Sequence, residues 1–384
     1  MDAPSTRSVR LALAGGGTGG HILPGANLCA HAAAAGELAD LVWFQTGRSV
    51  EVTAMQGFER RIEGVQFERS VLKLEPSGGG APSPLELSLK SLPGWMRARA
   101  RLRAHRTQVV LGLGGFTCLP VVLAARSLGL PVALLEINAV SGRATRWLSR
   151  MSTRVFHAWP GTLPDVAQRS ASTEHLWTGP PLAAAFDGTE VPLGGDPRER
   201  VRLGFEADRP LLLVLGGSQG ALGLNKFLAQ HAPGLLERRV QVLHQVGPGR
   251  MDEAALASQG YLAAEFLADV PAALRAATLV LCRGGASTLA EVGALRRPAW
   301  VVPYPHHPDR HQEHNARQLE PGVRIVQESD LDEERARELA RLCGQAGREP
   351  RAAMAAALGD RVPVDGVQRI WNDLVHLTES PRGA

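Results

Sequence analysis

The strongest constraint on the fold is a repeated pattern in which a short apolar run ends in glycines and a helical pattern follows. It occurs at Val9–Ala14, before the glycines at 15–20, and again at Leu211–Leu215, before those at 216–221. Apolar runs that alternate with helical patterns predict parallel sheets covered by helices. Further strands are expected at Leu41–Phe44, Gln108–Leu111, Val132–Ile137, Arg154–Ala158, Gln241–Val246, Thr278–Cys282 and Ala299–Val302.

A chain of 384 residues suits two domains better than one core. A stretch rich in proline and glycine, 179–197, separates the two series of strands and is predicted to be a linker. We therefore predict an α/β protein with two Rossmann-like domains that face a cleft, at residues 1–185 and 186–365. A C-terminal helix at 366–384 is expected to join the first domain. Sheets of this kind bind ligands at the carboxyl ends of their strands.

Composition excludes several other classes of protein. With 44% hydrophobic and 21% charged residues, the chain has the profile of a soluble globular protein. Its four cysteines lie far apart without a Cys-x-x-Cys pair, which argues against a disulfide framework and a zinc ribbon. The most hydrophobic stretch, Leu119 to Leu135, contains Arg126 and two prolines, so it is interpreted as buried helix and strand rather than a membrane span.

The first glycine loop, Gly15 to His21, indicates a phosphate site. Glycines let a phosphate approach the backbone, and the following helix start offers free N–H groups and a partial positive charge. The loop also satisfies the G-x-G-x-x-G pattern of dinucleotide enzymes. However, the acid expected after the next strand is missing, where Phe44 to Arg48 reads Phe-Gln-Thr-Gly-Arg. Only an NADP interpretation through Arg48 remains.

Two further glycine-containing loops in the second half of the chain also join a predicted strand to a predicted helix. They are Gly216–Ala221 and Cys282–Glu291. Glu291 falls about one turn into its helix, where a carboxylate would accept hydrogen bonds from two ribose hydroxyls. The alternative is a helix acid that only complements the dipole. Because helix N-termini stabilise each phosphate charge by roughly 0.3–1 kcal/mol, a nucleotide diphosphate needs no metal here. No metal or other cofactor is expected.

The loops, taken in order, resemble one known family, the MurG family of bacterial N-acetylglucosaminyltransferases. The matching residues are Gly16–Gly25, Gly112–Phe116, Gly216–Ala221, Arg283–Glu291, Pro303–Tyr304, Asp309–Gln312 and Asn315–Ala316. The resemblance implies the GT-B architecture, UDP-N-acetylglucosamine as donor and lipid I as acceptor. It also implies formation of lipid II for peptidoglycan, at the cytoplasmic face of the inner membrane.

The same resemblance implies a role for individual residues. Thr18, Gly19 and Gly20 would lie against the donor and the acceptor diphosphate, and Asn138 would contact the donor sugar. Ser218 would bind the donor phosphate, and Leu267 would border uracil. The positions implied to hold phosphate and ribose are Ala286, Ser287, Thr288, Leu289, Ala290 and Glu291. Gln312 would bind the sugar hydroxyls, and Gln219 and Arg283 complete the predicted substrate-binding set.

Several positions depart from the family pattern. Leu135-Glu136-Ile137-Asn138 stands for His-Glu-x-Asn, and Ala183 replaces an arginine that faces the donor. Gly284 and His311 replace a serine and a glutamine. These departures concern contacts with the sugar and the acceptor, so three alternatives remain. They are a related transferase with another acceptor, a UDP-sugar epimerase, and a nucleotide-sugar binding protein without turnover.

An inverting transfer requires a base near the acceptor hydroxyl. His21, at the end of the first loop, is the first candidate because an imidazole titrates near neutrality. It would otherwise orient the loop or bind acceptor phosphate. Glu136 is the second candidate, with a structural acceptor as its alternative. The histidine-rich run 306–314 suggests a metal through His311, His314 and Asp309, but its spacing matches no zinc pattern. It is interpreted instead as a loop that contacts the sugar.

A segment of the first domain combines apolar residues with cations. The apolar residues are Leu85, Leu87, Leu89, Leu92, Trp95 and Met96, and the cations are Lys90, Arg97, Arg99, Arg101, Arg103 and Arg106. This mixture is typical of peripheral contact with an anionic membrane, and its alternative is a half-buried helix with a solvated arginine face. No nucleic acid partner is expected, because no aromatic stacking set accompanies the arginines.

Overall fold

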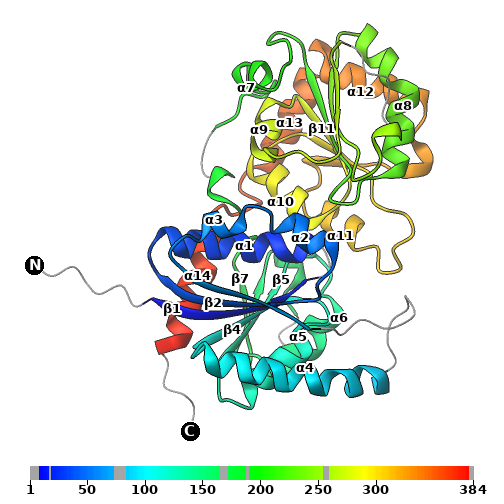
Figure 1. The fold of residues 1–384 in the computed structure, drawn as a ribbon. Coiled ribbons are helices and arrows are strands. Elements are labelled where there is room, and N and C mark those ends of the chain that lie inside the picture. Colours follow the sequence, from blue (N-terminus) through cyan, green and yellow to red (C-terminus); the bar gives the residue numbers. More distant parts are fainter. Residues whose placement is uncertain are drawn as a thin grey trace, which may run out of the picture. The chain divides into compact units, whose positions relative to one another are not determined.

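The computed structural model describes residues 8–16, 19–72, 84–164, 172–186, 190–253 and 259–379. The chain forms two compact units (Figure 1). The first comprises Met1–Ala184 together with Asp365–Ala384, and the second comprises Ala185–Val364. Both are parallel sheets covered by helices on their two faces.

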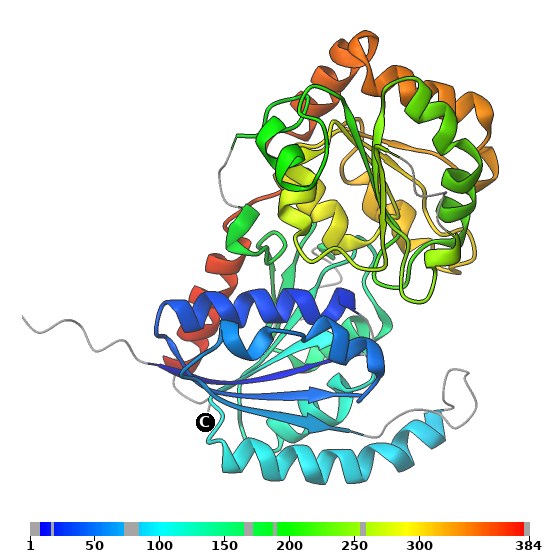
Figure 2. The same ribbon diagram turned by 45° about the horizontal axis from the view of Figure 1, so that its top comes forward.

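The first unit contains a seven-stranded parallel sheet in the order β3-β2-β1-β4-β5-β6-β7. Its strands are β1 (Val9–Gly15), β2 (Leu38–Gln45), β3 (Gln66–Val71), β4 (Val109–Gly114), β5 (Val132–Glu136), β6 (Arg154–His157) and β7 (Glu174–Trp177). Its helices are α1 (Gly19–Ala34), α2 (Ser49–Ala54), α3 (Phe58–Arg61), α4 (Pro84–Ala104), α5 (Cys118–Arg126), α6 (Arg143–Leu148) and α14 (Gly366–Glu379). Helices α1 and α14 lie side by side on one face, and α4 and α5 pack together on the other (Figures 1 and 2).

The second unit contains a six-stranded parallel sheet in the order β10-β9-β8-β11-β12-β13. Its strands are β8 (Leu211–Leu215), β9 (Gln241–Gln245), β10 (Tyr261–Ala264), β11 (Leu279–Cys282), β12 (Ala299–Val301) and β13 (Val323–Ile325). Its helices are α7 (Pro197–Arg202), α8 (Leu222–Glu237), α9 (Val270–Ala276), α10 (Ala286–Ala294), α11 (His311–Arg317), α12 (Glu333–Cys343) and α13 (Arg348–Leu358). A core that includes Leu212, Leu224, Phe227, Trp300 and Leu339 fills the space between sheet, α8 and α12.

The C-terminal helix belongs to the first unit, as expected. The Trp371 indole donates to the carboxylate of Glu37, next to β2, and Arg154 Nε lies 3.0 Å from Asp373 Oδ2. Trp371 is fully buried. Helix α14 therefore completes the cover of the first sheet from the far end of the chain.

The linker between the two units is shorter in the structure than the predicted stretch at 179–197. At its start, Asn27 of α1 donates to Pro181 O over 3.1 Å. At its end, Arg297 Nη1 donates to Pro192 O over 2.8 Å. Both flanks of the 179–197 stretch are thus attached to a unit, and α7 begins at Pro197, where Asp196 caps it.

The apolar stretch at 119–135 forms most of α5 and β5, as predicted. Among the described residues, no helix combines the length and the apolar character that crossing a membrane requires. A short 3₁₀ turn follows β9 at Met251–Glu253.

Candidate functional site

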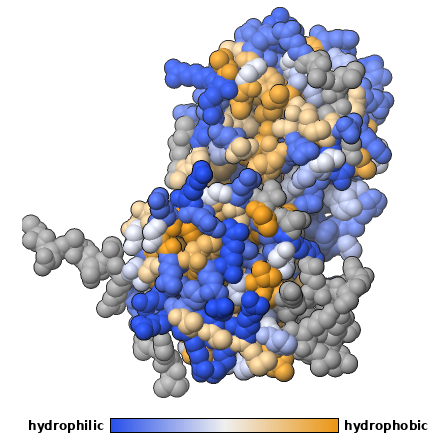
Figure 3. All heavy atoms as spheres, viewed as in Figure 1, coloured by the Kyte–Doolittle hydropathy of each residue, from blue (hydrophilic) through white to orange (hydrophobic). Residues whose placement is uncertain are grey.

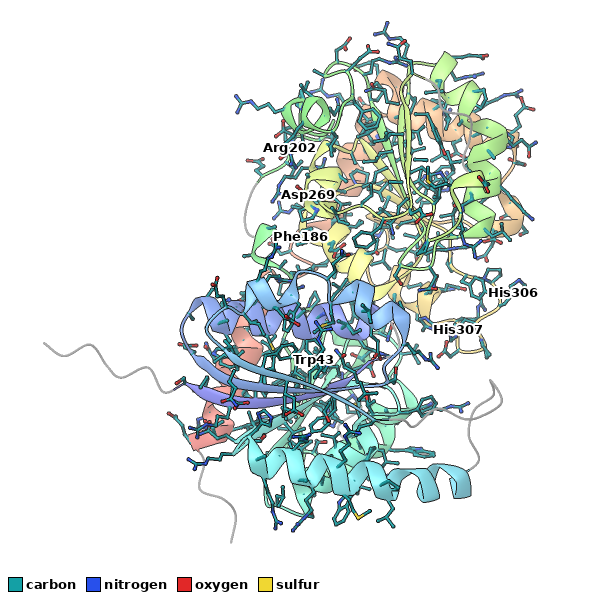
Figure 4. The ribbon with its side chains drawn as sticks, viewed as in Figure 1. Trp43, Phe186, Arg202, Asp269, His306 and His307 are labelled. Atoms are coloured by element: carbon teal, nitrogen blue, oxygen red, sulfur yellow. The ribbon has the colours of Figure 1, made fainter. Side chains whose placement is uncertain are left out.

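The end of β1 is braced by two residues of the neighbouring strand and loop. Trp43 of β2 donates its indole N–H to Gly15 O over 3.0 Å, from the sheet core labelled in Figure 4. The buried Glu51 carboxylate lies against Gly16, where a Cβ would come within 2.1 Å of Oε1. Hydrogen bonds from Thr46 N and Gly47 N fix that carboxylate, so only glycine fits at position 16. Thr18 lies outside the described residues, and Gly19 and Gly20 begin α1.

His21 lies in the first turn of α1, half-buried, between the first glycine loop and the end of β4. Its Nδ1 lies 3.3 Å from Gly16 O. A Cβ on Gly114, whose φ is +106°, would lie 3.1 Å from Nε2. A carbonyl oxygen only accepts hydrogen bonds, so this contact puts the proton on Nδ1 and leaves Nε2 as the acceptor nitrogen. The ring therefore turns its basic nitrogen toward the carboxyl end of the sheet.

Glu136 is buried at the end of β5 and serves the loop that follows it. Its carboxylate accepts from Asn138 N at 3.1 Å, Gly142 N at 2.8 Å and Thr145 Oγ1 at 2.6 Å. These bonds close the turn into α6, which favours the structural alternative over a catalytic base. Asn138 lies half-buried in the same turn.

In the second unit, the loop at 216–221 joins β8 to α8. Gly217 and Gly220 have φ of +82° and +71°. A Cβ on Gly220 would lie 2.1 Å from Val246 O, so the turn requires glycine there. Ser218 and Gln219 are exposed at its tip. No side chain caps α8, so its first N–H groups are available to an anion.

The loop after β11 leads into α10, which also lacks a side-chain cap at Gly285. Ser287 Oγ is buried and has no hydrogen-bond partner among the described residues. Ala286 is buried and Thr288 half-buried beside it. In contrast, Leu289 and Ala290 are buried in the core, with exposed fractions of 0% and 1%. Their side chains are therefore not available to a ligand, unlike those of Ser287 and Thr288.

Glu291, in the second turn of α10, is half-buried, and its carboxylate has no hydrogen bond to a described residue. Burial raises the pKa of its carboxyl from 4.5 to about 8. Desolvation without a compensating donor is costly for a carboxylate. A ligand with two adjacent hydroxyl groups would supply the missing donors.

Arg283 and Gln312 connect the loops that follow β11 and β12. Arg283 is buried and donates to Val302 O over 3.1 Å, and it forms an ion pair with Glu328. Gln312 Oε1 accepts from Gly284 N at 3.3 Å and Tyr304 N at 2.9 Å. Arg283 thus has a structural role here, while these two contacts of Gln312 use its amide oxygen and leave its amide nitrogen for a ligand.

Leu267 lies half-buried in the loop after β10, away in sequence from the other predicted positions. Within the second unit, the structure brings Gly284, next to Arg283, into direct contact with Gln312 and Asn315. Within the first, it joins His21 to the first glycine loop and to the end of β4. Sequence reasoning missed Trp43 and Glu51, because a tryptophan in a strand and an acid in a short helix carry no recognisable signal.

Two family models match the chain. The glycosyltransferase family 28 N-terminal domain covers residues 11–157, and the C-terminal domain of that family covers 211–360. Together with two parallel-sheet units whose glycine loops follow the strand ends, they define a glycosyltransferase of the GT-B architecture.

Curated relatives narrow this class. The chain is 37% identical, over 97% of its length and 90% of the relative, to a UDP-N-acetylglucosamine–N-acetylmuramyl-(pentapeptide) pyrophosphoryl-undecaprenol N-acetylglucosamine transferase of Sorangium cellulosum. An enzyme with this name from Erwinia tasmaniensis is 34% identical, over 83% of this chain and 85% of the relative. The crystal structure of Acinetobacter baumannii MurG matches with a TM-score of 0.69 at 25% identity, covering 96% of this chain and 99% of that one. The chain belongs to the MurG family of N-acetylglucosamine transferases.

A fold likeness extends to proteins with another reaction. A putative UDP-N-acetylglucosamine 2-epimerase from Listeria monocytogenes matches with a TM-score of 0.67 at 15% identity, over 98% of both chains. At that identity the match demonstrates the shared fold alone.

Proposed function

We propose that the chain transfers N-acetylglucosamine from UDP-N-acetylglucosamine to lipid I, the undecaprenyl-diphosphate-linked N-acetylmuramyl-pentapeptide, and so forms lipid II. The observation that carries this proposal is the match to transferases of that activity over nearly the whole of both chains. The fold likeness to epimerases carries no comparable weight, because it comes without close sequence identity.

In the proposed reaction, the acceptor hydroxyl oxygen attacks the anomeric carbon of the donor sugar. The bond between that carbon and the diphosphate oxygen breaks, UDP departs, and the hydroxyl proton passes to His21 Nε2. The contact between Nδ1 and Gly16 O supports this role, because it fixes the tautomer with a basic Nε2. Glu136 is less suited, because three donors already occupy its carboxylate.

The second unit would hold the nucleotide. The uncapped starts of α8 and α10 would stabilise the diphosphate, with Ser218, Gln219, Ser287 and Thr288 beside it. Glu291 would accept from the ribose hydroxyls. Asn138, Gln312 and Leu267 keep their proposed contacts with sugar and uracil. Because the helix starts and the backbone N–H groups supply the positive field, the transfer step uses no metal or other cofactor.

We also propose that the first unit docks on the cytoplasmic face of the inner membrane, as a peripheral protein. Exposed apolar residues on α4, α5, α6 and the loop before α5 support this, and we call them the apolar patch: Leu92, Met96, Phe116, Leu123 and Trp147. Exposed arginines accompany them: Arg97, Arg126, Arg143, Arg146 and Arg150. Figure 3 presents apolar residues among hydrophilic ones along the lower edge of this unit. The side chains of Leu85, Leu87, Leu89 and Lys90 lie outside the described residues.

Apolar area and cations together favour an anionic lipid surface, which also carries the lipid-linked acceptor. Nucleic acid is not proposed as a partner, because the arginines stand beside aliphatic side chains rather than a set of stacked aromatic rings.

The proposal is tested by measuring UDP release from UDP-N-acetylglucosamine with and without a lipid I analogue. Release that depends on the analogue, with a disaccharide product, is the expected result. A changed sugar without any acceptor would identify an epimerase. UDP binding without turnover would identify a binding protein and would contradict the proposal.

A further inference from the structure

The loop between β12 and α11 gathers two imidazoles and one carboxylate at a single point. Nδ1 of His307 and Nδ1 of His311 each lie 2.8 Å from the same oxygen, Asp309 Oδ1. The two rings meet edge to face, with centroids 4.1 Å apart. One ligand atom from each of the three residues lies within 4.8 Å of the other two. The cluster comes from a five-residue stretch and needs no rearrangement of the fold.

Contacts of buried residues in α11 hold this loop in place. Glu313, which is buried, forms ion pairs with Arg310 and Arg317, the latter at 2.7 Å. Asn315 donates to Gly284 O over 3.0 Å, and thereby ties α11 to the end of β11. These contacts fix the start of α11, and with it the backbone that carries His311. The three side chains above it are exposed or half-buried (His307 is labelled in Figure 4), so an ion can reach them.

The donor set selects the class of ion. Two imidazoles and one carboxylate suit Zn²⁺, Co²⁺ or Ni²⁺, whereas Mg²⁺ and Ca²⁺ prefer oxygen ligands alone. We propose that His307, Asp309 and His311 bind one divalent transition-metal ion, with water at its remaining positions. The sequence analysis paired His311 with His314 and found no metal pattern; the fold instead brings His307 beside His311.

This inference goes beyond the proposed transfer, which uses no metal at the reacting atoms. The ion would act on the loop. Gln312 follows His311 directly, and its side chain accepts from Tyr304 N at the other end of the loop. A bound ion would link residues 307, 309 and 311, next to this contact, and so restrict the motion of the 304–312 segment. The consequence is a loop that is more ordered with the ion than without it.

The test uses the full-length chain without an affinity tag, after removal of metals with a chelator. Co²⁺ is titrated in while its visible absorption is followed, and Zn²⁺ is then added to displace it. We expect one tight equivalent in the parent protein, and affinity at least about tenfold weaker in His307→Ala, Asp309→Asn and His311→Ala. His314→Ala is the matched control, since it removes an exposed histidine of the same helix that lies outside the cluster.

A second readout follows amide hydrogen exchange of the 304–312 segment with and without Zn²⁺. Exchange should slow in the parent and in His314→Ala, and stay unchanged in His307→Ala. Thermal unfolding of each variant checks that it folds. Equal Co²⁺ affinity in the parent and the three cluster variants would overturn the proposal, as would absence of a tight equivalent or equally strong binding of Mg²⁺.

Discussion

Both units contain a parallel sheet covered by helices, but arginines on their helices differ in whether they form ion pairs. In the second unit, two of the three arginines of α12 are paired: Arg335 lies 2.8 Å from Glu338, and Arg337 forms an ion pair with Glu333. In the first unit, Arg97, Arg143 and Arg146 have no ion pair with a described carboxylate. Trp147, directly after Arg146 on α6, is 66% exposed.

The presence or absence of ion pairs distinguishes the helix surfaces of the two units. A paired cation gains little from an approaching anionic surface, because its charge is already partly compensated. An unpaired arginine beside an exposed tryptophan gains both electrostatic and apolar contact. The comparison supports the proposal that the first unit contacts the membrane, whereas the nucleotide is proposed to bind to the second unit. The following predictions address that division, beginning with the largest effect.

Replacement of His21 with alanine should remove the proposed base of the first unit and so slow the transfer step, while UDP binding to the second unit should not change. Loss of a positioned base lowers kcat by about 10²–10⁴-fold, while UDP binding stays as in the parent. Steady-state kinetics and calorimetry with UDP separate the two effects. His31→Ala, at the end of the same helix, is the control and should retain activity. If His21→Ala kept the parent kcat, the base would lie elsewhere.

Glu291→Ala should produce the opposite result. Removal of a carboxylate that accepts two ribose hydroxyls should weaken UDP binding by about 10–100-fold, since hydrogen bonds to charged groups contribute about 1.5–3 kcal/mol. Glu237→Ala, an exposed acid at the end of α8, is the control in calorimetry. Unchanged affinity for UDP in Glu291→Ala would remove this residue from the site.

The same residue has a pH signature that requires no ligand. Because burial raises the folded-state pKa of Glu291 from 4.5 to about 8, the folded protein binds more protons than the unfolded chain between these values. Its contribution to stability therefore declines as pH rises through that window. Glu291→Gln should gain stability relative to the parent at pH 7.5 but not at pH 4.5, as measured by thermal unfolding.

The sequence predicted the centre of each sheet and missed its edges. All strands expected at the start were found within a few residues, whereas β3, β7, β10 and β13 were not predicted. These four are the edge strands. The burial of β3 and β7 is mixed, with few fully buried residues, so neither shows a continuous apolar run. A central strand is buried on both faces and leaves a clear apolar run in the sequence.

The positions of the glycine loops between a strand and a helix were predicted correctly, whereas the directions of single side chains were not. The glycine loops were located because a tight turn before a helix restricts residue type. The direction of a side chain depends on helix phase instead, and for that reason Leu289 and Ala290 fall in the core. The partner of Arg283, Glu328, is far away in the sequence, and the partners of Glu136 depend on how the turn after β5 folds, so the sequence pattern reveals neither. The roles of the remaining predicted residues stay predictions.

A fourth prediction tests the charge comparison between the units. Arg146→Glu should weaken binding to vesicles that contain anionic lipid by about fivefold or more, because each cation near such a surface contributes about 1 kcal/mol. Trp147→Ser should weaken it through lost apolar contact. Arg337→Glu, on the paired surface of α12, is the matched control and should bind vesicles like the parent. Co-sedimentation at several salt concentrations measures this, and equal loss in all three variants would contradict the division.

The smallest effect concerns two buried histidines, one in each unit, whose pKa values move in opposite directions. Burial lowers the pKa of His105, but hydrogen bonds to Glu68 and Asp40 and their negative charges outweigh it, so the pKa is raised above 6.5. Burial lowers the pKa of His244 to about 4, and its Nδ1 lies 2.7 Å from the Tyr261 hydroxyl.

The signs follow from these shifts. The stability contributed by His105 is fully present below pH 6.5 and is lost as pH rises through the raised folded pKa. The stability contributed by His244 is present above pH 6.5 and is lost as pH falls toward 4.

His105→Gln should therefore reduce the free energy of unfolding most at pH 5.5 and less at pH 9, and His244→Gln should reduce it most at pH 8 and less at pH 5. With a cost near 1 kcal/mol, the shift in Tm is about 2–4 °C. Thermal unfolding of both variants across this range measures it, with each variant serving as the control for the other. If both variants lost stability at the same end of the pH range, the two units would not differ in the way their buried histidines are held.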